Sequence, residues 1–248
     1  MKIYYRNLCK LVLFCQLKIG ENNNMDISAK AILIKRINKV TKNLEKNNMQ
    51  VFYVERKDDV VNKVAELLKD GDTVGIGGAR SLSESGVLDL LRSGKYNFLD
   101  RYEEGLSREN IEKIFITSFS ADAYICSSNA ITENGELYNV DGNSNRVAAI
   151  CYGPKSVIII VGYNKIVRDL DDAVKRVKSI AAPANCDRLS SETYCREKGE
   201  CMSFLSDASD MASGCNSTAR ICCNYVVSAY QRKKDRIKVI IVGEELGY

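Results

Sequence analysis

The chain has 248 residues, of which 45% are hydrophobic and 27% charged, a composition typical of a globular protein with a buried core. The formal net charge is only +4 and the basic residues are scattered, so we expect no nucleic-acid partner. No apolar run approaches the roughly 20 residues that a membrane span needs, which argues against a membrane partner. Histidine is absent, so acid–base chemistry falls to Asp, Glu, Lys, Tyr or Cys, and metal binding to Cys or carboxylate.

The first 24 residues differ in character from the rest of the chain. They have a basic start and a short apolar run, Leu11–Phe14, which no small-residue cleavage site follows. The pair Gly20-Glu21 can be encoded by GGAGAA, a purine-rich ribosome-binding sequence suitably spaced before Met25. We therefore expect translation to start at Met25. Residues 1–24 are then a non-native or disordered extension, and residues 25–248 form a single domain.

Helical and extended patterns alternate along the domain. Apolar residues recur at helical spacing over 26–47, with Asp26 or Ser28 as the cap, and 50–54 is typical of a strand. Further helices are predicted over 57–69, from Ser81, and over 110–115, 145–151 and 170–180. Further strands are predicted over 72–76, 123–126, 157–161 and 237–242. Strands that alternate with helices predict an α/β fold with an open, mostly parallel sheet covered by helices.

Four of the predicted strands end in glycine or polar residues. These ends are Gly77-Gly78, Ser127–Asn129, Gly162–Lys165 and Gly243-Glu244. If the strands are parallel, all four ends lie along one edge of the sheet, where open α/β sheets bind their ligands. The double glycine before Ser81 either holds an anion at a helix N-terminus or is a purely structural turn. It matches neither the P-loop nor the dinucleotide fingerprint.

The segment 129–146 combines carboxylates, amides, glycines and one arginine, with little apolar periodicity. Such groups make up sites for small polar ligands. Arg146 and Lys165 are candidates for binding a carboxylate or phosphate. The alternatives are that Arg146 locks its own loop through hydrogen bonds and that Lys165 is simply solvated. The acid–base candidates are Glu84, Glu133, Asp141 and Glu244. The ligand-binding candidates are Gly77, Gly78, Ser81, Asn129, Thr132, Asn145, Arg146, Asn164 and Lys165.

Five blocks of glycine-rich and polar sequence carry a family resemblance. They are Gly77–Gly86, Ser128–Leu137, Asn139–Ala148, Tyr152–Lys155 and Gly162–Lys165. Together they resemble the LUD domain family of lactate-utilisation proteins, over about Asp26 to Tyr248. The resemblance implies a fold like that of glucosamine-6-phosphate deaminase, ribose-5-phosphate isomerase and the CoA transferases. It also implies iron–sulfur and FAD-linked oxidoreductase subunits as partners. One departure is Ala79-Arg80, where relatives frequently have a serine after the double glycine.

Six of the ten cysteines cluster near the end of the chain. They are Cys186, Cys195, Cys201, Cys215, Cys222 and Cys223. The spacing Cys195-x5-Cys201-x13-Cys215-x6-Cys222 resembles that of family members with four cysteines in this region, although their middle gap is usually much shorter. Four thiolates can close a zinc site or hold an iron–sulfur cluster; the alternative is unligated, reduced thiols. We expect a cysteine-rich lobe at 186–223 with a metal or cluster at Cys195, Cys201, Cys215 and Cys222.

Three functions remain open on the sequence. The first is an accessory subunit of an iron–sulfur-dependent lactate-oxidation system that binds a small anionic ligand. The second is a free-standing enzyme that acts on a CoA ester or a sugar phosphate. The third is a metal-stabilised interaction module. The cysteine usage fits a reduced, cytoplasmic setting for all three.

Overall fold

A computed structural model describes residues 25–206 and 210–248. The predicted extension 1–24 lies outside these residues. The chain divides into two compact units, Met1–Leu33 and Ile34–Tyr248. Helix α1 (Ile27–Lys46) begins in the first unit and continues into the second; it starts after Asp26, whose carboxylate accepts from the amides of Ser28 and Ala29. The side chain of Asp26 therefore satisfies two amides that have no partner inside the helix.

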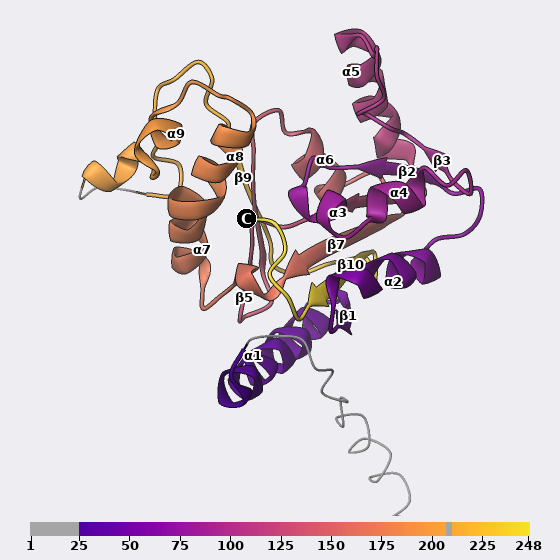
Figure 1. Ribbon diagram of the computed structural model, residues 1–248, viewed down its shortest axis with the longest axis horizontal. Helices are drawn as coiled ribbons and strands as arrows, with labels where there is room; N and C mark the ends of the chain where they lie inside the picture. Colours follow the sequence, from indigo (N-terminus) through magenta and orange to yellow (C-terminus); the bar gives the residue numbers. More distant parts are fainter. Residues whose placement is uncertain (1–24, 207–209) are drawn as a thin grey trace, which may run out of the picture. The chain divides into compact units, whose positions relative to one another are not determined.

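A six-stranded sheet in the order β1-β10-β7-β4-β2-β3 organises the larger unit (Figure 1). All five neighbouring pairs are parallel. The strands are β1 (Gln50–Val54), β2 (Thr73–Ile76), β3 (Asn97–Phe98), β4 (Ala123–Cys126), β7 (Ser156–Gly162) and β10 (Ile237–Val242). The prediction of an open parallel sheet covered by helices is confirmed. Strand β3, only two residues long, is not predicted by the sequence pattern.

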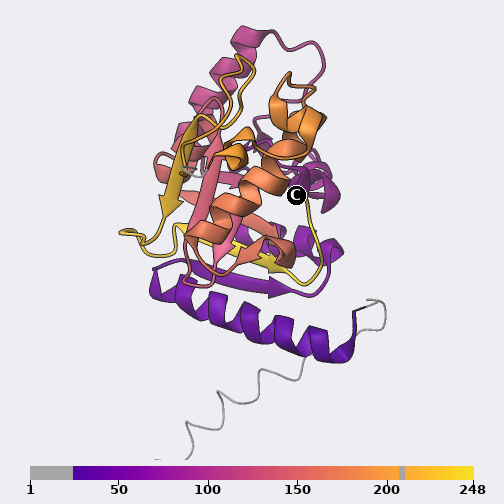
Figure 2. The ribbon, with the colours of Figure 1, turned by 90° about the vertical axis from the view of Figure 1, so that its left-hand side faces the viewer.

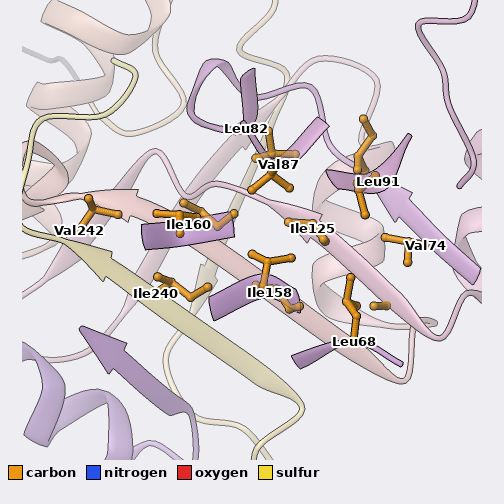
Figure 3. Close-up of a cluster of buried hydrophobic side chains, with 14 of the residues drawn as sticks. Leu68, Val74, Leu82, Val87, Leu91, Ile125, Ile158, Ile160, Ile240 and Val242 are labelled. Atoms are coloured by element: carbon orange, nitrogen blue, oxygen red, sulfur yellow. The ribbon is translucent and has the colours of Figure 1, made fainter. Parts of the chain in front are cut away.

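The hydrophobic core on one face of this sheet is closed by α2 (Val60–Leu67), α3 (Arg80–Glu84) and α4 (Val87–Leu91) (Figure 3). Ile158 and Ile160 of β7 belong to this core. Successive strand residues point to opposite faces, and every residue from Val157 to Val161 is fully buried. Each buried aliphatic side chain stabilises the fold by roughly 1.5–3 kcal/mol, so β7 is anchored from both sides.

The larger unit has five further α-helices among its described residues. They are α5 (Arg108–Thr117), α6 (Asn145–Cys151), α7 (Leu170–Arg176), α8 (Ala182–Arg188) and α9 (Tyr194–Lys198). The 3-10 helices are η1 (Lys57–Asp59), η2 (Ser118–Ser120), η3 (Tyr163–Lys165) and η5 (Met202–Leu205), and η4 (Val177–Ala181) is a π-helix. The helix predicted over 170–180 is thus α7 followed by η4. Among the described helices, none is long and apolar enough to cross a membrane.

A second, four-stranded sheet in the order β8-β5-β6-β9 accounts for much of the polar segment 129–146. Its strands are β5 (Ala130–Thr132), β6 (Leu137–Asp141), β8 (Ile166–Val167) and β9 (Asn224–Ser228). Strand β9 pairs antiparallel with β6 (Figure 2). Tyr138 and Val140 share a core with Ala173 and Val177. The sequence pattern does not predict this sheet, because runs of two to five residues are too short to show a period of two.

The turn between β5 and β6 packs on the second half of α1. Gly135 has a φ of +83°, and a Cβ there would lie 2.5 Å from the backbone carbon of Asn43. The Asn43 side-chain amide donates to the Glu133 carbonyl oxygen. The Glu133 carboxylate pairs with Lys39 Nζ at 2.7 Å and Arg36 Nε at 2.9 Å, and these contacts lower the pKa of Glu133. Glu133 therefore joins the hairpin to α1.

Candidate functional site

A cavity of about 650 Å³ lies at the carboxyl ends of β2, β4 and β7, and it includes Gly78, Asn129 and Lys165. This is the edge of the sheet on which the sequence places a ligand. We call it the cationic cavity, because six basic residues line it. They are Arg80, Arg101, Arg146, Lys165, Arg188 and Arg220. Among the described lining residues, Asp141 has the one side-chain carboxylate. The charge of this cavity suits an anionic ligand.

Lys165 is the most unusual group in the cavity. It is 3% exposed, and its amine donates to the hydroxyls of Ser127 at 3.0 Å and Ser81 at 3.1 Å. Within the described residues, the amine makes no ion pair with a carboxylate. Burial, together with the positive charges of Arg176 and Arg146, lowers the pKa of Lys165 from 10.5 to about 7. Such a shift in a cavity wall is a sign of a functional group.

Residues near the end of the chain hold Lys165 from one side. Gly247 has a φ of +61°, and a Cβ there would lie 2.7 Å from the Ser81 hydroxyl and 3.2 Å from the Lys165 amine. The Asn164 amide donates to the Gly247 carbonyl oxygen at 2.9 Å. Glu84 accepts from the Gly247 amide at 2.7 Å and also pairs with Arg80. Asn164 and Glu84, predicted as ligand-binding and acid–base residues, therefore position the backbone that covers Lys165.

Arg146 lines the cavity, but its hydrogen bonds are directed into the protein. Its guanidinium donates to the carbonyl oxygens of Ser127 and Val140 and to the side-chain oxygens of Asn129 and Asn139. Its Nε lies 3.5 Å from the carboxylate of Asp141. A guanidinium has five N–H groups, so these partners leave little capacity for a ligand. The geometry favours the alternative in which Arg146 locks its own loop.

The predicted site residues do not all meet in one place. Those that line the cavity are Gly78, Asn129, Asp141, Asn145, Arg146 and Lys165. Ser81 lies behind Lys165, and Gly77 packs against Arg146, where a Cβ would lie 2.9 Å from the Arg146 Cδ. The Thr132 hydroxyl donates to Glu136, and Glu244 accepts from the Lys57 amide. Neither Thr132 nor Glu244 lines the cavity, and Glu133 pairs with α1 instead.

Several site residues are missed by sequence reasoning. Arg101 lies in a loop without periodic pattern, with its guanidinium carbon 4.6 Å from the Phe115 ring centroid. Arg176 is 7% exposed and donates to the backbone carbonyls of Asn129 and Asn164. Arg176 has a signal in the sequence: it stands between apolar positions of the helix predicted over 170–180, on its buried side.

Five cysteines line a second, smaller cavity of about 30 Å³, the thiol cavity. They are Cys186, Cys195, Cys201, Cys215 and Cys222, all with free thiols. Cys186 Sγ lies 3.6 Å from Cys195 Sγ. Burial, with a further contribution from neighbouring thiols, raises the pKa of Cys186 to about 11 and that of Cys222 to about 12. In the part of the chain that the structure describes, no group of three or more His, Cys, Asp or Glu is arranged to hold a metal ion.

Residues 37–242 match the model of the LUD domain family. The chain belongs to the LUD domain family. The five glycine-rich and polar blocks that resemble this family are thereby confirmed as family sequence, and the chain is a lactate-utilisation-related protein. The comparison with curated proteins gives no match.

Three solved structures are similar to this LUD domain protein. A DUF162 family protein from Deinococcus radiodurans has 14% identity and a TM-score of 0.45, with 86% of this chain and 98% of that chain covered. The eIF2B delta protein from Chaetomium thermophilum has 19% identity and a TM-score of 0.33, covering 62% and 60%. The tetrameric eIF2B-beta2-delta2 complex from C. thermophilum has 21% identity and a TM-score of 0.31, covering 57% and 49%.

Replacement of Arg146 by alanine is expected to lower the free energy of unfolding by on the order of 3–5 kcal/mol, because it removes the donor of several part-buried acceptors and the cation paired with Asp141. Urea denaturation measures the change. Arg101→Ala is the matched control: this arginine lines the same cavity but stacks on the rings of Phe115 and Tyr102. We expect it to cost less than about 1 kcal/mol. Equal stability of the two variants would contradict the loop-locking role.

Lys165 is expected to make stability depend on pH. Between its folded pKa of about 7 and its ordinary value of 10.5, the unfolded chain binds a proton that the folded chain does not. The free energy of unfolding therefore rises with pH in this window, by on the order of 1 kcal/mol per pH unit from this group. Urea denaturation at several pH values should show this increment in the wild type and its absence in Lys165→Met. The exposed Lys42→Met variant should keep the wild-type slope; parallel pH profiles for wild type and Lys165→Met would refute the assignment.

Proposed function

We propose that this LUD domain protein is an accessory component of a lactate-oxidation system and binds a small carboxylate in its cationic cavity. The observation that carries the proposal is the buried Lys165 amine, which faces a cavity lined by arginines and pairs with no carboxylate among the described residues. A bound carboxylate would supply the negative charge that the protein itself does not place beside Lys165.

The geometry of the cavity suits a carboxylate with a neighbouring oxygen substituent. The Lys165 amine and the Ser127 hydroxyl offer a point charge and a hydrogen bond side by side, 3.0 Å apart. Arg101 adds a second cationic group. Its guanidinium contacts the rings of Tyr102 and Phe115, and such contacts use none of its N–H donors, so these can bind a ligand. Lactate and its oxidation product pyruvate both carry such a group. Membership of the LUD domain family supports this choice over other small acids.

The partners of this activity are proposed on the same family grounds. An accessory component that holds the substrate or product of lactate oxidation would work beside iron–sulfur and FAD-linked oxidoreductase subunits in the cytoplasm. The chain itself would then contribute ligand binding, and the electrons would pass through the partner subunits.

A second candidate function follows from the size of the cavity. A volume of about 650 Å³ is within the usual range of about 300–1,000 Å³ for ligand sites and exceeds what lactate alone fills. A free-standing enzyme that acts on a CoA ester or a sugar phosphate would use the extra volume. Arg188 and Arg220, which also line the cavity, are engaged with the side chain of Asn185 and with backbone carbonyls, respectively. This engagement of outlying arginines favours the smaller ligand.

Ligand binding is expected to raise the melting temperature of the purified protein with lactate or pyruvate. Lys165→Met and Arg101→Ala should each weaken binding, measured by calorimetry, by on the order of 10–100-fold, which corresponds to about 1.5–3 kcal/mol for a charge-assisted contact. Lys42→Met should bind like the wild type. A melting shift with CoA or sugar phosphates alone would select the second candidate function, and no shift with any of these ligands would remove both.

We also propose that the thiol cavity holds a metal ion, which would stabilise the cysteine-rich lobe. Five thiols around one cavity supply more than the four ligands of a tetrahedral zinc site. Arg220 holds this lobe by donating to the carbonyl oxygens of Ala212, Cys215 and Cys222. A volume of about 30 Å³ suits a single ion such as Zn²⁺ better than a four-iron cluster. Ligation would draw the sulfurs together and link the lobe to η4 and α8.

The metal proposal predicts about one zinc ion per chain in protein purified without oxygen, measured by mass spectrometry of metals. Cys195→Ser should lower the metal content and the melting temperature, because a structural site contributes its binding energy to folding. Cys223→Ser is the matched control, since that thiol is exposed and does not line the thiol cavity. Broad visible absorption would show an iron–sulfur cluster instead. Protein with neither zinc nor iron would leave unligated thiols as the answer.

A further inference from the structure

We propose that Lys165 is a nucleophile that forms an imine with a 2-oxo acid bound in the cationic cavity. This inference rests on the proposed binding of a small carboxylate at the same place. It adds a covalent step to that binding. The step distinguishes pyruvate from lactate, because only pyruvate has a carbonyl group.

The first support is the surroundings of the amine. A lysine that merely attracts anions works best when exposed and charged, whereas Lys165 is 3% exposed and its described partners are two neutral hydroxyls. The charged groups that act on it are Arg146 from α6, Arg176 from α7 and Glu84 from α3. The two arginines disfavour a third positive charge, and Glu84 is occupied by Arg80 and the Gly247 amide.

These surroundings favour the free amine, which is the form that attacks a carbonyl carbon. With a pKa of about 7, close to half of the Lys165 side chains carry the free amine at neutral pH. An exposed lysine with an ordinary pKa near 10.4 has about a thousandth of its side chains in that form. The hydroxyls of Ser81 and Ser127 and the Gly247 backbone also fix the position of the amine, so less ordering of the reacting atoms is needed.

The reaction balances without any oxidant or reductant. The lone pair of Lys165 Nζ forms a bond to the carbonyl carbon of the 2-oxo acid, and the carbonyl double bond opens. A proton passes from the nitrogen to the oxygen, giving a carbinolamine. The carbinolamine oxygen then takes up one proton from solvent, the carbon–oxygen bond breaks as water leaves, and the nitrogen lone pair forms the double bond of a protonated imine. Addition of water and release of that proton reverse these steps. The hydroxyls of Ser127 and Ser81, at 3.0 and 3.1 Å from Nζ, are placed to relay the proton.

The substrate class follows from the same geometry. A 2-oxo acid places its carboxylate one carbon from the carbonyl, so the carboxylate can meet the arginines of the cavity while the carbonyl carbon meets Nζ. The protonated imine carries a positive charge next to the carboxylate of the bound acid, and this charge pair stabilises it. A neutral carbinolamine has no such charge. Lactate has the same carboxylate but a hydroxyl in place of the carbonyl, so it can occupy the site and cannot react.

The test is reductive trapping on the intact, full-length chain. The protein is incubated with pyruvate and sodium cyanoborohydride, digested, and mapped by mass spectrometry for lysines that carry a carboxyethyl group. We expect Lys165 to be labelled at least about tenfold more than any exposed lysine, with excess lactate suppressing the label by competition. Lys165→Arg should lose this label, and Lys42→Met should keep it. The wild-type map answers the question even if the Lys165 variant fails to fold.

The outcomes separate this inference from the proposed function. Lactate and pyruvate that bind in calorimetry, with Lys165 labelled no more than exposed lysines, would overturn the imine and leave the carboxylate site intact. Absence of both binding and labelling would overturn both. Labelling of Lys165 by a 2-oxo acid, with protection by lactate, supports both.

Discussion

The arrangement of the site depends on the buried guanidinium of Arg146. Its donors connect the end of β4, at Ser127, to β6, at Asn139 and Val140. Through Ser127 this contact also fixes one of the two hydroxyls that hold the Lys165 amine. A lysine in place of Arg146 could not reproduce the contact, because an ammonium group has three donors and lacks the planar fork. Together with the hydrogen bonds from the Ser128 hydroxyl to the Tyr138 carbonyl oxygen and from the Val140 amide to the Asn129 side chain, Arg146 therefore joins the end of β4 to the second sheet.

Arg146 stabilises the fold, whereas the buried amine of Lys165 destabilises it. A buried amine without a carboxylate partner opposes folding at neutral pH, and a methionine of similar length would pack there at lower cost. The fold tolerates this because β7, which leads into η3, is buried on both faces from Val157 to Val161. Residues that contradict the rules of core formation in an otherwise regular sheet are expected at functional sites.

The sequence predicts every strand of the six-stranded sheet except β3, because the longer strands are mainly apolar runs, most of which end in glycine or polar residues. The parallel direction follows from the alternation with helices, and it brings the ends with Gly78, Asn129 and Lys165 to one cavity. The second sheet is not predicted, because β5 and β8 are too short to show the two-residue alternation of a strand. The partner of each side chain is not predicted for another reason. Glu133 pairs with Arg36 and Lys39 of a helix distant in sequence, and even the nearer partners of Arg146 and Cys186 are set by the fold, which residue spacing alone does not encode.

The cationic cavity and the thiol cavity have a common wall. Val177 and Ala182, at either end of the π-helix, line both, and so do Arg220, Ile221 and Cys222. A change in the position of Cys222 on one side therefore changes the shape available to a ligand on the other. Thermodynamic reciprocity gives this a definite form: if occupancy of the thiol cavity alters the affinity for an anion by some factor, the anion alters the affinity of the thiols for their ligand by the same factor. If the proposed carboxylate and the proposed metal ion both bind, the residues shared by the two cavities would couple the two affinities.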